Sequence, residues 1–170
     1  RRQRQMCIRD SYKCYAEAEA GKNIEKSLKA IEERYNEIIK GLGLKLSLKE
    51  QFETIKKNFE ALAGKDYAAS RGEYLNGIIM ANYLGYEFID AATVICFDKD
   101  GEFDSEKTNA VCEAKFANIE RAVVPGFYGA MPNGKVKTFS RGGSDVTGSI
   151  VARALKACLL YTSDAADDRI

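Results

Sequence analysis

The sequence predicts an α/β fold in which a mainly parallel sheet lies between helices, with an N-terminal helical hairpin ahead of it. Three observations lead to this prediction. The first third of the chain has no proline and carries two segments with apolar residues at helical spacing. From residue 86 onward, short β-branched segments alternate with helical segments. A length of 170 residues fits one domain.

The helical hairpin is predicted from residues 12–40 and 48–62. The apolar stripe of the first segment consists of Ile24, Leu28, Ile31, Tyr35, Ile38 and Ile39. Asn23 is a candidate cap for this helix, and the glycines at 41 and 43 end it. Ser47 and Glu50 have the spacing of a capping box for the second helix. Its stripe consists of Phe52, Ile55, Phe59 and Leu62.

A third helix is predicted over residues 70–84, after a loop at 64–69, and Gly85 ends it. Leu75, Ile78, Ile79, Ala81 and Leu84 suit its buried side. Residues 86–90 are expected to form a strand. Residues 91–97 fit either a buried strand or a helical turn, because periodicity alone does not separate these. The acidic segment 98–101 is predicted to be a solvated turn and not a calcium loop, since the downstream ligands of an EF-hand are missing.

The second half of the predicted sheet begins after a helix that Asp104 or Ser105 caps and that runs to residue 119. Residues 121–125 form a β-branched strand, which Pro125 and Gly126 end. The segment 126–129 then lies beyond the carboxyl ends of the strands, where open α/β sheets bind ligands. A hairpin over residues 131–139 is expected to turn at Pro132-Asn133-Gly134.

Composition excludes several classes of function. A net charge of +1 gives no electrostatic case for nucleic-acid binding, and the absence of histidine excludes a histidine triad or metal site. Five cysteines without a C-x-x-C pair argue against a disulfide framework or a zinc site, which points to the reducing cytoplasm. No apolar run has the length of a membrane span.

Residues 137–149, KTFSRGGSDVTGS, carry the densest group of candidate functional residues. They precede a predicted helix at 149–156, with Ser144 or Asp145 as its N-cap. Gly142 and Gly143 would let the backbone approach a ligand, and the first turn of the helix offers unpaired N–H groups to an anion. Arg141 supplies a planar fork for a carboxylate or phosphate.

Three runs together resemble the aspartokinases of the amino-acid kinase family. FSRGGSD at 139–145 resembles their signature, and ASRGEYLNG at 69–77 resembles their S-x-G-E motif. VVPGFYG at 123–129 is similar to the segment before their substrate loop. The resemblance extends from Tyr12 to Ala157 and implies a partial amino-acid kinase fold, in which the helical hairpin is an insertion beside the active site.

The resemblance also implies an activity, the ATP-dependent phosphorylation of L-aspartate to 4-phospho-L-aspartate in lysine, threonine and methionine biosynthesis. ATP and Mg²⁺ are the implied cofactors, and no residue of this chain is expected to bind the metal directly. The parent enzyme is expected to be a cytoplasmic homo-oligomer.

By position, Arg141 would hold the α-carboxylate of aspartate and Glu73 its ammonium group, with Ser70 in the same substrate-binding motif. Ser144 and the backbone of Gly142 and Gly143 would approach the substrate or the transferring phosphate. Asp145 would orient catalytic groups. Arg71 is interpreted as structural.

The two ends do not continue this resemblance. Residues 1–11 and 158–170 are interpreted as non-native tails that resemble translated adapter sequence, which leaves residues 12–157 as a partial catalytic domain. The family's opening K-F-G-G-[ST] motif and its downstream nucleotide segment are missing. We therefore expect the chain to be an internal fragment that is inactive alone.

Two alternatives remain open from the sequence. Another amino-acid kinase, acting on glutamate, acetylglutamate or a nucleotide monophosphate, would share the sheet and the glycine loops. A non-catalytic small-ligand binding module would use the glycines only as turns.

Overall fold

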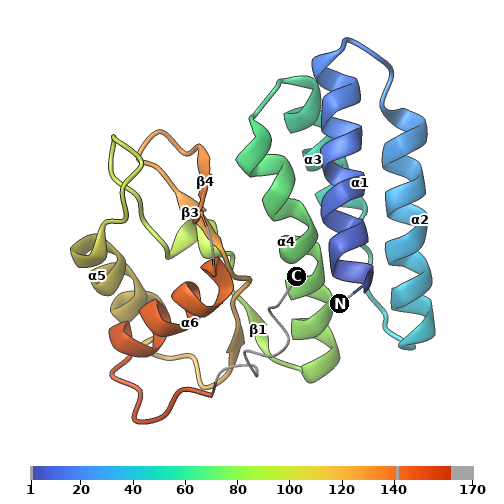
Figure 1. Ribbon diagram of the computed structural model, residues 1–170. Coiled ribbons are helices and arrows are strands. Elements are labelled where there is room, and N and C mark those ends of the chain that lie inside the picture. The colour runs from blue at the N-terminus through green and yellow to red at the C-terminus, as the bar shows by residue number, and fades with distance from the viewer. Residues whose placement is uncertain (1, 141, 162–170) are drawn as a thin grey trace.

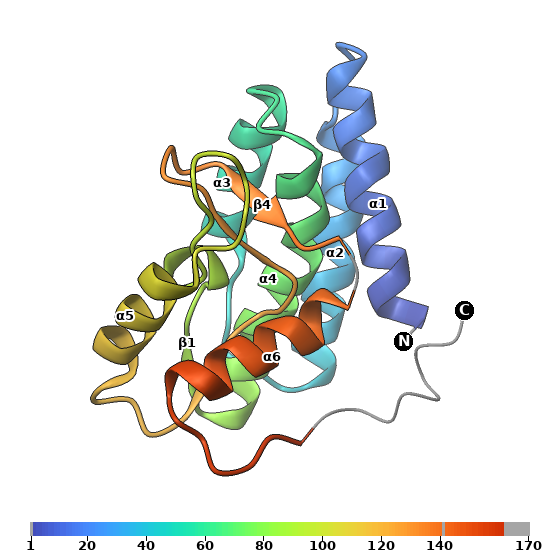
Figure 2. The same cartoon turned by 60° about the vertical axis from the view of Figure 1, so that its left-hand side comes forward.

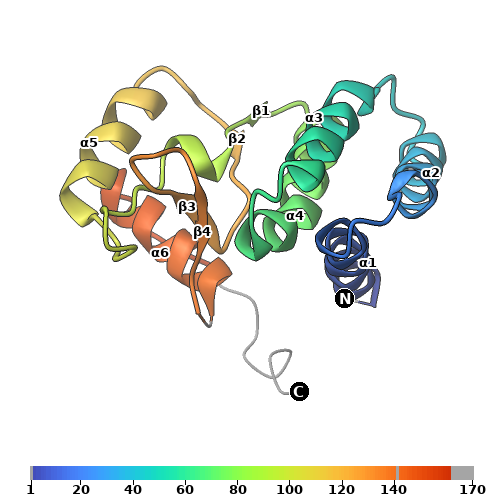
Figure 3. The same cartoon turned by 90° about the horizontal axis from the view of Figure 1, so that it is seen from above.

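The computed structural model describes residues 2–140 and 142–161, with side chains from Arg9 onward (Figure 1). The elements follow in the order α1 (Arg2–Glu19), α2 (Glu25–Gly41), α3 (Lys49–Glu60), α4 (Lys65–Leu84), β1 (Glu87–Phe88), a 3₁₀ turn η1 (Ala91–Thr93), α5 (Ser105–Phe116), β2 (Ala122–Val123), β3 (Tyr128–Ala130), β4 (Val136–Thr138) and α6 (Gly143–Ala154). Helices α1 to α4 form one part of the molecule, and the strands with α5 and α6 form the other (Figure 3).

The helical part has its own hydrophobic core, which confirms the predicted hairpin. The apolar stripe of α2 buries Leu28, Ile31, Tyr35 and Ile39, and that of α3 buries Phe52, Ile55 and Phe59. Cys14 and Tyr15 of α1 and Tyr67 and Leu75 of α4 complete this cluster. Leu62 is an exception, because α3 ends at Glu60 and leaves this side chain 52% exposed.

The predicted caps of this part are only partly formed. Asn23 does accept a hydrogen bond from the Glu25 N–H at 2.8 Å, as a cap would, although Ile24 is the first flanking residue of α2. The capping box predicted for α3 is wrong. Its N-cap is Leu48 and it has no side-chain cap hydrogen bond, and Ser47 accepts a long 3.4 Å bond from the Lys49 N–H.

Helix α4 begins at Lys65, five residues earlier than predicted. The residue before the helix is Gly64, whose φ of 107° is a conformation that suits glycine and separates α4 from the preceding turn. Residues 65–69 then continue without a helix breaker, and Ala68 and Ala69 are buried. As a result Glu73 does not lie in the first turn of the helix, so complementing the helix dipole does not explain it.

The strands confirm the α/β class. Strand β1 pairs in parallel with β2, with Glu87 opposite Ala122 and Phe88 opposite Val123. An isolated parallel bridge joins Cys96 to Ala130. Residues 91–97, for which strand and helical turn were both open, form the turn η1 and then single bridges at Cys96 and Phe97. The cap of α5 is Asp104, which accepts from the Lys107 N–H as expected.

Two predictions near the end of the chain need correction. The hairpin does turn at residues 131–135, but its first strand is β3, paired antiparallel with β4, and thus includes Tyr128 and Gly129 of the expected ligand loop. Helix α6 begins at Gly143 with Gly142 as its N-cap, so neither Ser144 nor Asp145 caps it. Gly142 has a left-handed conformation with φ 60°, and no described side chain forms a cap hydrogen bond at the start of this helix.

A second hydrophobic cluster lies among the strands, α5 and α6. Its buried members include Ile89, Val94, Ile95, Cys112 and Tyr128. Tyr74 of α4 and Val136 of β4 pack against both clusters. Both side chains therefore help to join the two parts, and α1 and α5 lie on opposite sides of the molecule (Figure 2).

Part of the segment 1–11, interpreted above as a non-native tail, lies in α1. Asp10 forms an ion pair with Arg34 of α2, and Ser11 is buried. The domain boundaries at residues 12 and 157 remain predictions.

Candidate functional site

The S-x-G-E segment lies in the second and third turns of α4. Ser70 is fully buried, and its hydroxyl donates a 2.8 Å hydrogen bond to the carbonyl oxygen of Tyr67. The same hydroxyl accepts from Arg71, at 3.1 Å from Nε and 2.8 Å from Nη2. The Ser70 hydroxyl therefore forms its hydrogen bonds within α4 and does not face solvent.

Glu73 follows Ser70 by three residues, so the two side chains leave α4 from the same face. Glu73 is half-buried. The structure thus brings these two predicted substrate-binding residues together on one helix, with Ser70 beneath the surface and Glu73 nearer to it.

Arg71 lies inside the molecule, 6% exposed, among aromatic rings. Its guanidinium carbon is 4.4 Å from the ring centroid of Tyr67, 4.5 Å from that of Tyr74 and 5.5 Å from that of Tyr128. These distances are within the range of cation–π interactions, which gain strength when the cation is desolvated. Tyr67, Arg71 and Tyr74 are spaced four and three residues apart, so one helix face carries them.

Tyr128 extends this group from α4 to the sheet. Its hydroxyl donates a 2.7 Å hydrogen bond to Oδ1 of Asp90, which also accepts from the Ala92 N–H. Burial, and then the charge of Asp90, raise the pKa of Tyr128 far above its usual range. The same two causes raise the pKa of Tyr74. Both phenols therefore stay protonated at neutral pH.

The two glycine motifs meet where the 126–127 loop packs on the first turn of α6. A Cβ built on Gly126 would lie 2.9 Å from Cα of Ser144, and one built on Gly143 would lie 2.6 Å from Cβ of Phe127. Such distances leave no room for a methyl group, so this approach requires glycine at both positions. Phe127 itself has a positive φ of 65°.

A side chain of α6 fixes the loop in this place. The Phe127 N–H donates to Oγ1 of Thr147 at 3.0 Å, and the Thr147 hydroxyl donates to the carbonyl oxygen of Gly143 at 2.7 Å. Thr147 is buried, whereas Ser144 and Asp145 are exposed. The first turn of α6 is thus held from one side and open to solvent on the other.

The predicted site residues fall into two groups in space. Ser70 and Glu73 belong to α4, and Gly142, Gly143, Ser144 and Asp145 belong to the start of α6. Arg141, the remaining predicted residue, lies outside the described residues. A series of contacts connects the two groups. Arg71 lies over the ring of Tyr128, the rings of Tyr128 and Phe127 are 6.0 Å apart, and Phe127 packs closely on Gly143.

Sequence reasoning missed Tyr128 and Asp90, and assigned Arg71 no particular partner. The spacing of Tyr67, Arg71 and Tyr74 would have revealed their common face if the start of α4 had been placed at Lys65. The partnership of Tyr128 with Asp90 spans 38 residues, and no local pattern predicts it.

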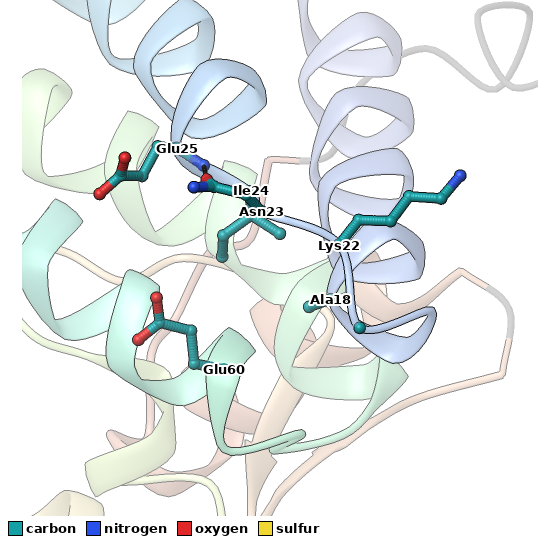
Figure 4. A pocket seen from close by; sticks show the side chains of 7 residues that line it. Ala18, Lys22, Asn23, Ile24, Glu25 and Glu60 are labelled. Atoms are coloured by element: carbon teal, nitrogen blue, oxygen red, sulfur yellow. Dashed lines mark hydrogen bonds between the residues drawn. The ribbon is translucent and has the colours of Figure 1, made fainter.

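Three hollows among the described residues lie away from both groups. One of about 420 Å³ lies between the turn after α1 and the end of α3, lined by Lys22, Asn23, Glu25 and Glu60 among others (Figure 4). Lys22 points away from the two carboxylates, and Glu25 pairs with Lys56 at 2.8 Å. This hollow includes none of the motif residues.

Within the described residues, no set of three acidic or cysteine side chains is arranged to hold a metal ion. Nor does any described helix combine the length and apolar character needed to cross a bilayer. The four cysteines whose surroundings are described, Cys14, Cys96, Cys112 and Cys158, are all free thiols.

Comparison with known proteins identifies the class to which this fold and these motifs belong. The model of the amino acid kinase family matches residues 14–166, and the chain belongs to this family. Its relatives within the family are aspartokinases. Aspartokinase 3 of Bacillus subtilis is 36% identical over 102 residues, which cover 55% of this chain and 22% of that protein.

Solved structures give the same result. The aspartate kinase of Clostridium acetobutylicum, described as an allosteric enzyme, superposes with a TM-score of 0.83 at 49% identity, covering 89% of this chain and 35% of that chain. Aspartokinase III of Escherichia coli, solved with aspartate and ADP, superposes with a TM-score of 0.64 at 23% identity over 78% of this chain and 34% of that one, and supports the fold alone. The chain thus spans about a third or less of the length of these proteins.

Proposed function

We propose that this chain is the amino-acid-binding part of an ATP-dependent aspartate kinase, which forms 4-phospho-L-aspartate and ADP. The observation that carries the proposal is the packing of the 126–127 loop on the first turn of α6. This packing leaves Ser144 and Asp145 exposed at a helix start that suits an anion. The 49% identity to the Clostridium aspartate kinase over most of the chain supports aspartate as the substrate.

The residues have distinct tasks in this proposal. The Glu73 carboxylate faces the ammonium group of aspartate, and Arg141 binds its α-carboxylate with two N–H groups. Ser70 keeps the backbone of α4 in place beneath Glu73. The side-chain carboxylate of aspartate then attacks the γ-phosphorus of ATP, the bond from that phosphorus to the bridging oxygen breaks, and ADP leaves. This transfer depends mainly on positioning and charge neutralisation.

The first turn of α6 fits the phosphate end of this reaction. Its N–H groups and the backbone of Gly142 and Gly143 attract a phosphate, but the exposed carboxylate of Asp145 repels a bare one. Mg²⁺ is usually bound through phosphates with few protein ligands, and when carried by the nucleotide it would supply charge neutralisation next to the Asp145 carboxylate. Asp145 would orient the catalytic groups.

The setting of the parent enzyme is part of the same proposal. A reducing cytoplasm is the proposed compartment, since the five cysteines include no C-x-x-C pair. The reaction is the entry to lysine, threonine and methionine biosynthesis, and the parent enzyme is a homo-oligomer.

Calorimetric titration of the chain with L-aspartate tests the proposal. Wild type is expected to bind L-aspartate more tightly than L-glutamate, and Glu73→Gln to weaken aspartate binding by about tenfold or more, as loss of a charge-assisted hydrogen bond does. Glu53→Gln on the exposed face of α3 is the control and is expected to bind as wild type does. Equal binding of the two amino acids, or an unchanged Glu73→Gln variant, would sink the assignment.

A further inference from the structure

Arg71 is a buried cation whose described partners are aromatic rings and neutral oxygens. Besides its stacking on three tyrosines, it donates to the Tyr67 carbonyl oxygen at 3.3 Å and twice to Ser70. Among the described residues no salt bridge includes it. A buried charge usually requires such a set of partners to compensate for lost hydration. The three rings and the two oxygen atoms around Arg71 therefore compensate for the hydration that its guanidinium loses on burial.

These partners come from two elements that carry the two halves of the candidate site. Tyr67, Ser70 and Tyr74 belong to α4, which carries Glu73 two residues after Arg71. Tyr128 belongs to β3 and directly follows Phe127, which contacts the first turn of α6. One guanidinium thus lies between the helix that carries Glu73 and the strand that follows the 126–127 loop, which packs on the first turn of α6.

We infer that Arg71 is a positioning residue, which holds α4 against β3 and so fixes the first turn of α6 relative to Glu73. The inference rests on the proposed function for the claim that this spacing determines affinity for the amino acid. Lysine does not replace arginine in this role, because an ammonium group lacks the flat face and the fork of N–H groups that Arg71 uses.

The test uses Arg71→Lys in the whole chain, with Arg121→Lys as a matched control. Arg121 also lies over a ring, 5.7 Å from Tyr86, but its side chain is 63% exposed. Two quantities are measured after circular dichroism has verified the fold. One is amide hydrogen exchange along the chain, without any ligand, and the other is the dissociation constant for L-aspartate.

The expected result is local. Arg71→Lys speeds exchange at the amides of Phe127 and of residues 143–147 by about tenfold relative to those of α2, and weakens aspartate binding by a similar factor. Arg121→Lys changes neither. A general loss of stability would speed exchange in α2 to the same extent, so uniform acceleration would overturn the inference, as would no change at residues 143–147.

A second variant covers the case in which Arg71→Lys does not fold. Tyr128→Phe keeps the ring over Arg71 but removes the hydrogen bond that anchors it to Asp90. Faster exchange at residues 143–147 in this variant supports the inference, and unchanged exchange contradicts it. If wild type does not bind aspartate, the proposed function fails, while hydrogen exchange still decides the role of Arg71.

Discussion

Gly143 is the residue at which the 126–127 loop and α6 come closest. A methyl group there would lie 2.8 Å from Cα of Phe127, which is backbone and cannot rotate away. We expect Gly143→Ala to lower the free energy of unfolding by roughly 1–3 kcal/mol, in the range of overpacking. Denaturant unfolding followed by circular dichroism measures this change.

Gly148 provides the control in the same helix. A Cβ there would have its nearest neighbour at 3.9 Å, an ordinary contact. Gly148→Ala should raise the free energy of unfolding by about 0.5–1 kcal/mol, because alanine favours the helix. If both variants were equally stable, the close approach of loop and helix would be wrong.

Cys14 illustrates the effect of burial on a single thiol. It is fully buried, and burial, with a smaller effect of Glu17, raises its pKa from 9.0 to about 11. The thiolate is the nucleophile. Peptide mapping after treatment with iodoacetamide at pH 8 should therefore find Cys14 unmodified when the exposed Cys158 is fully alkylated. Early modification of Cys14 in the folded chain would contradict its burial.

The same raised pKa predicts a direction for stability. Between pH 9 and about 11 the folded chain keeps the proton of Cys14 while the unfolded chain releases it, so the free energy of unfolding falls as pH rises. Below pH 9 this contribution is fully present. Cys14→Ala should show a shallower decline than Cys158→Ala when urea unfolding is repeated across this range.

Single residues also show where sequence reasoning stops. The roles implied for Glu73, Ser144 and Asp145 came from a motif match and stay predictions; Glu73 is half-buried, and Ser144 and Asp145 are exposed. The contact of Arg71 with Tyr128 was not predictable, because the two residues are distant in the sequence.

Helix α4 packs against α1 and α3 and also against β1, β2 and β4. Its first turn is fixed by Asp66, whose carboxylate accepts from Oγ1 of Thr138 at 2.9 Å and from the Thr138 N–H at 3.4 Å. We expect Asp66→Ala to lower the free energy of unfolding by about 1–3 kcal/mol, because a charge-assisted bond and a partner of β4 are lost. Urea unfolding measures the change.

A double-mutant cycle with Thr138→Val isolates this contact. The two substitutions together should cost less than the sum of the single ones, since both remove the same bond. Asp100→Ala, at an exposed turn, is the matched control and should stay within about 0.5 kcal/mol of wild type. Strict additivity of Asp66→Ala and Thr138→Val would exclude the bond between α4 and β4.

The starts of elements were harder to predict than their existence. The stripes of α2 and α3 were evident from spacing. The start of α4 was predicted at Ser70, but the helix begins at Lys65, because Gly64 with its positive φ is the residue that precedes the first turn. The hairpin turn at Pro132 was predicted from its turn residues. Its first strand was misplaced because Tyr128 and Gly129 also suit a loop, and the pairing with β4 decides between them.

At the scale of the whole molecule, two hydrophobic clusters share Tyr74 and Val136. We expect them to unfold as one unit, since removing either would expose these shared side chains. Phe59→Ala in the helical cluster should lower the free energy of unfolding by about 3–5 kcal/mol. The free energy of opening obtained from amide exchange in α5, on the other side of the molecule, should fall by the same amount.

Leu62→Ala is the matched control, since this side chain is 52% exposed near the end of the same helix. It should change the free energy of unfolding by less than about 0.5 kcal/mol. Exchange in α5 that stays at the wild-type rate in Phe59→Ala would mean that the two clusters open independently.

The α/β class was predictable at this scale, because the order of apolar segments distinguishes helices from strands. The division of the core into two clusters was not, because it depends on which faces of α4 are covered. α4 is buried on several sides, with Ser70, Gly72 and Gly77 as well as Leu75 inside, so its sequence has no single apolar stripe.

The surroundings of Arg71 have one consequence for how this protein responds to its solution. A guanidinium stays charged under nearly all conditions, and the phenols of Tyr67, Tyr74 and Tyr128 all have raised pKa values. Dissolved ions also screen a buried contact poorly. The junction between α4 and β3 should therefore be insensitive to buffer pH around neutrality and to ionic strength. Any dependence of ligand affinity on either would then report on groups that face the ligand and not on a change in the scaffold.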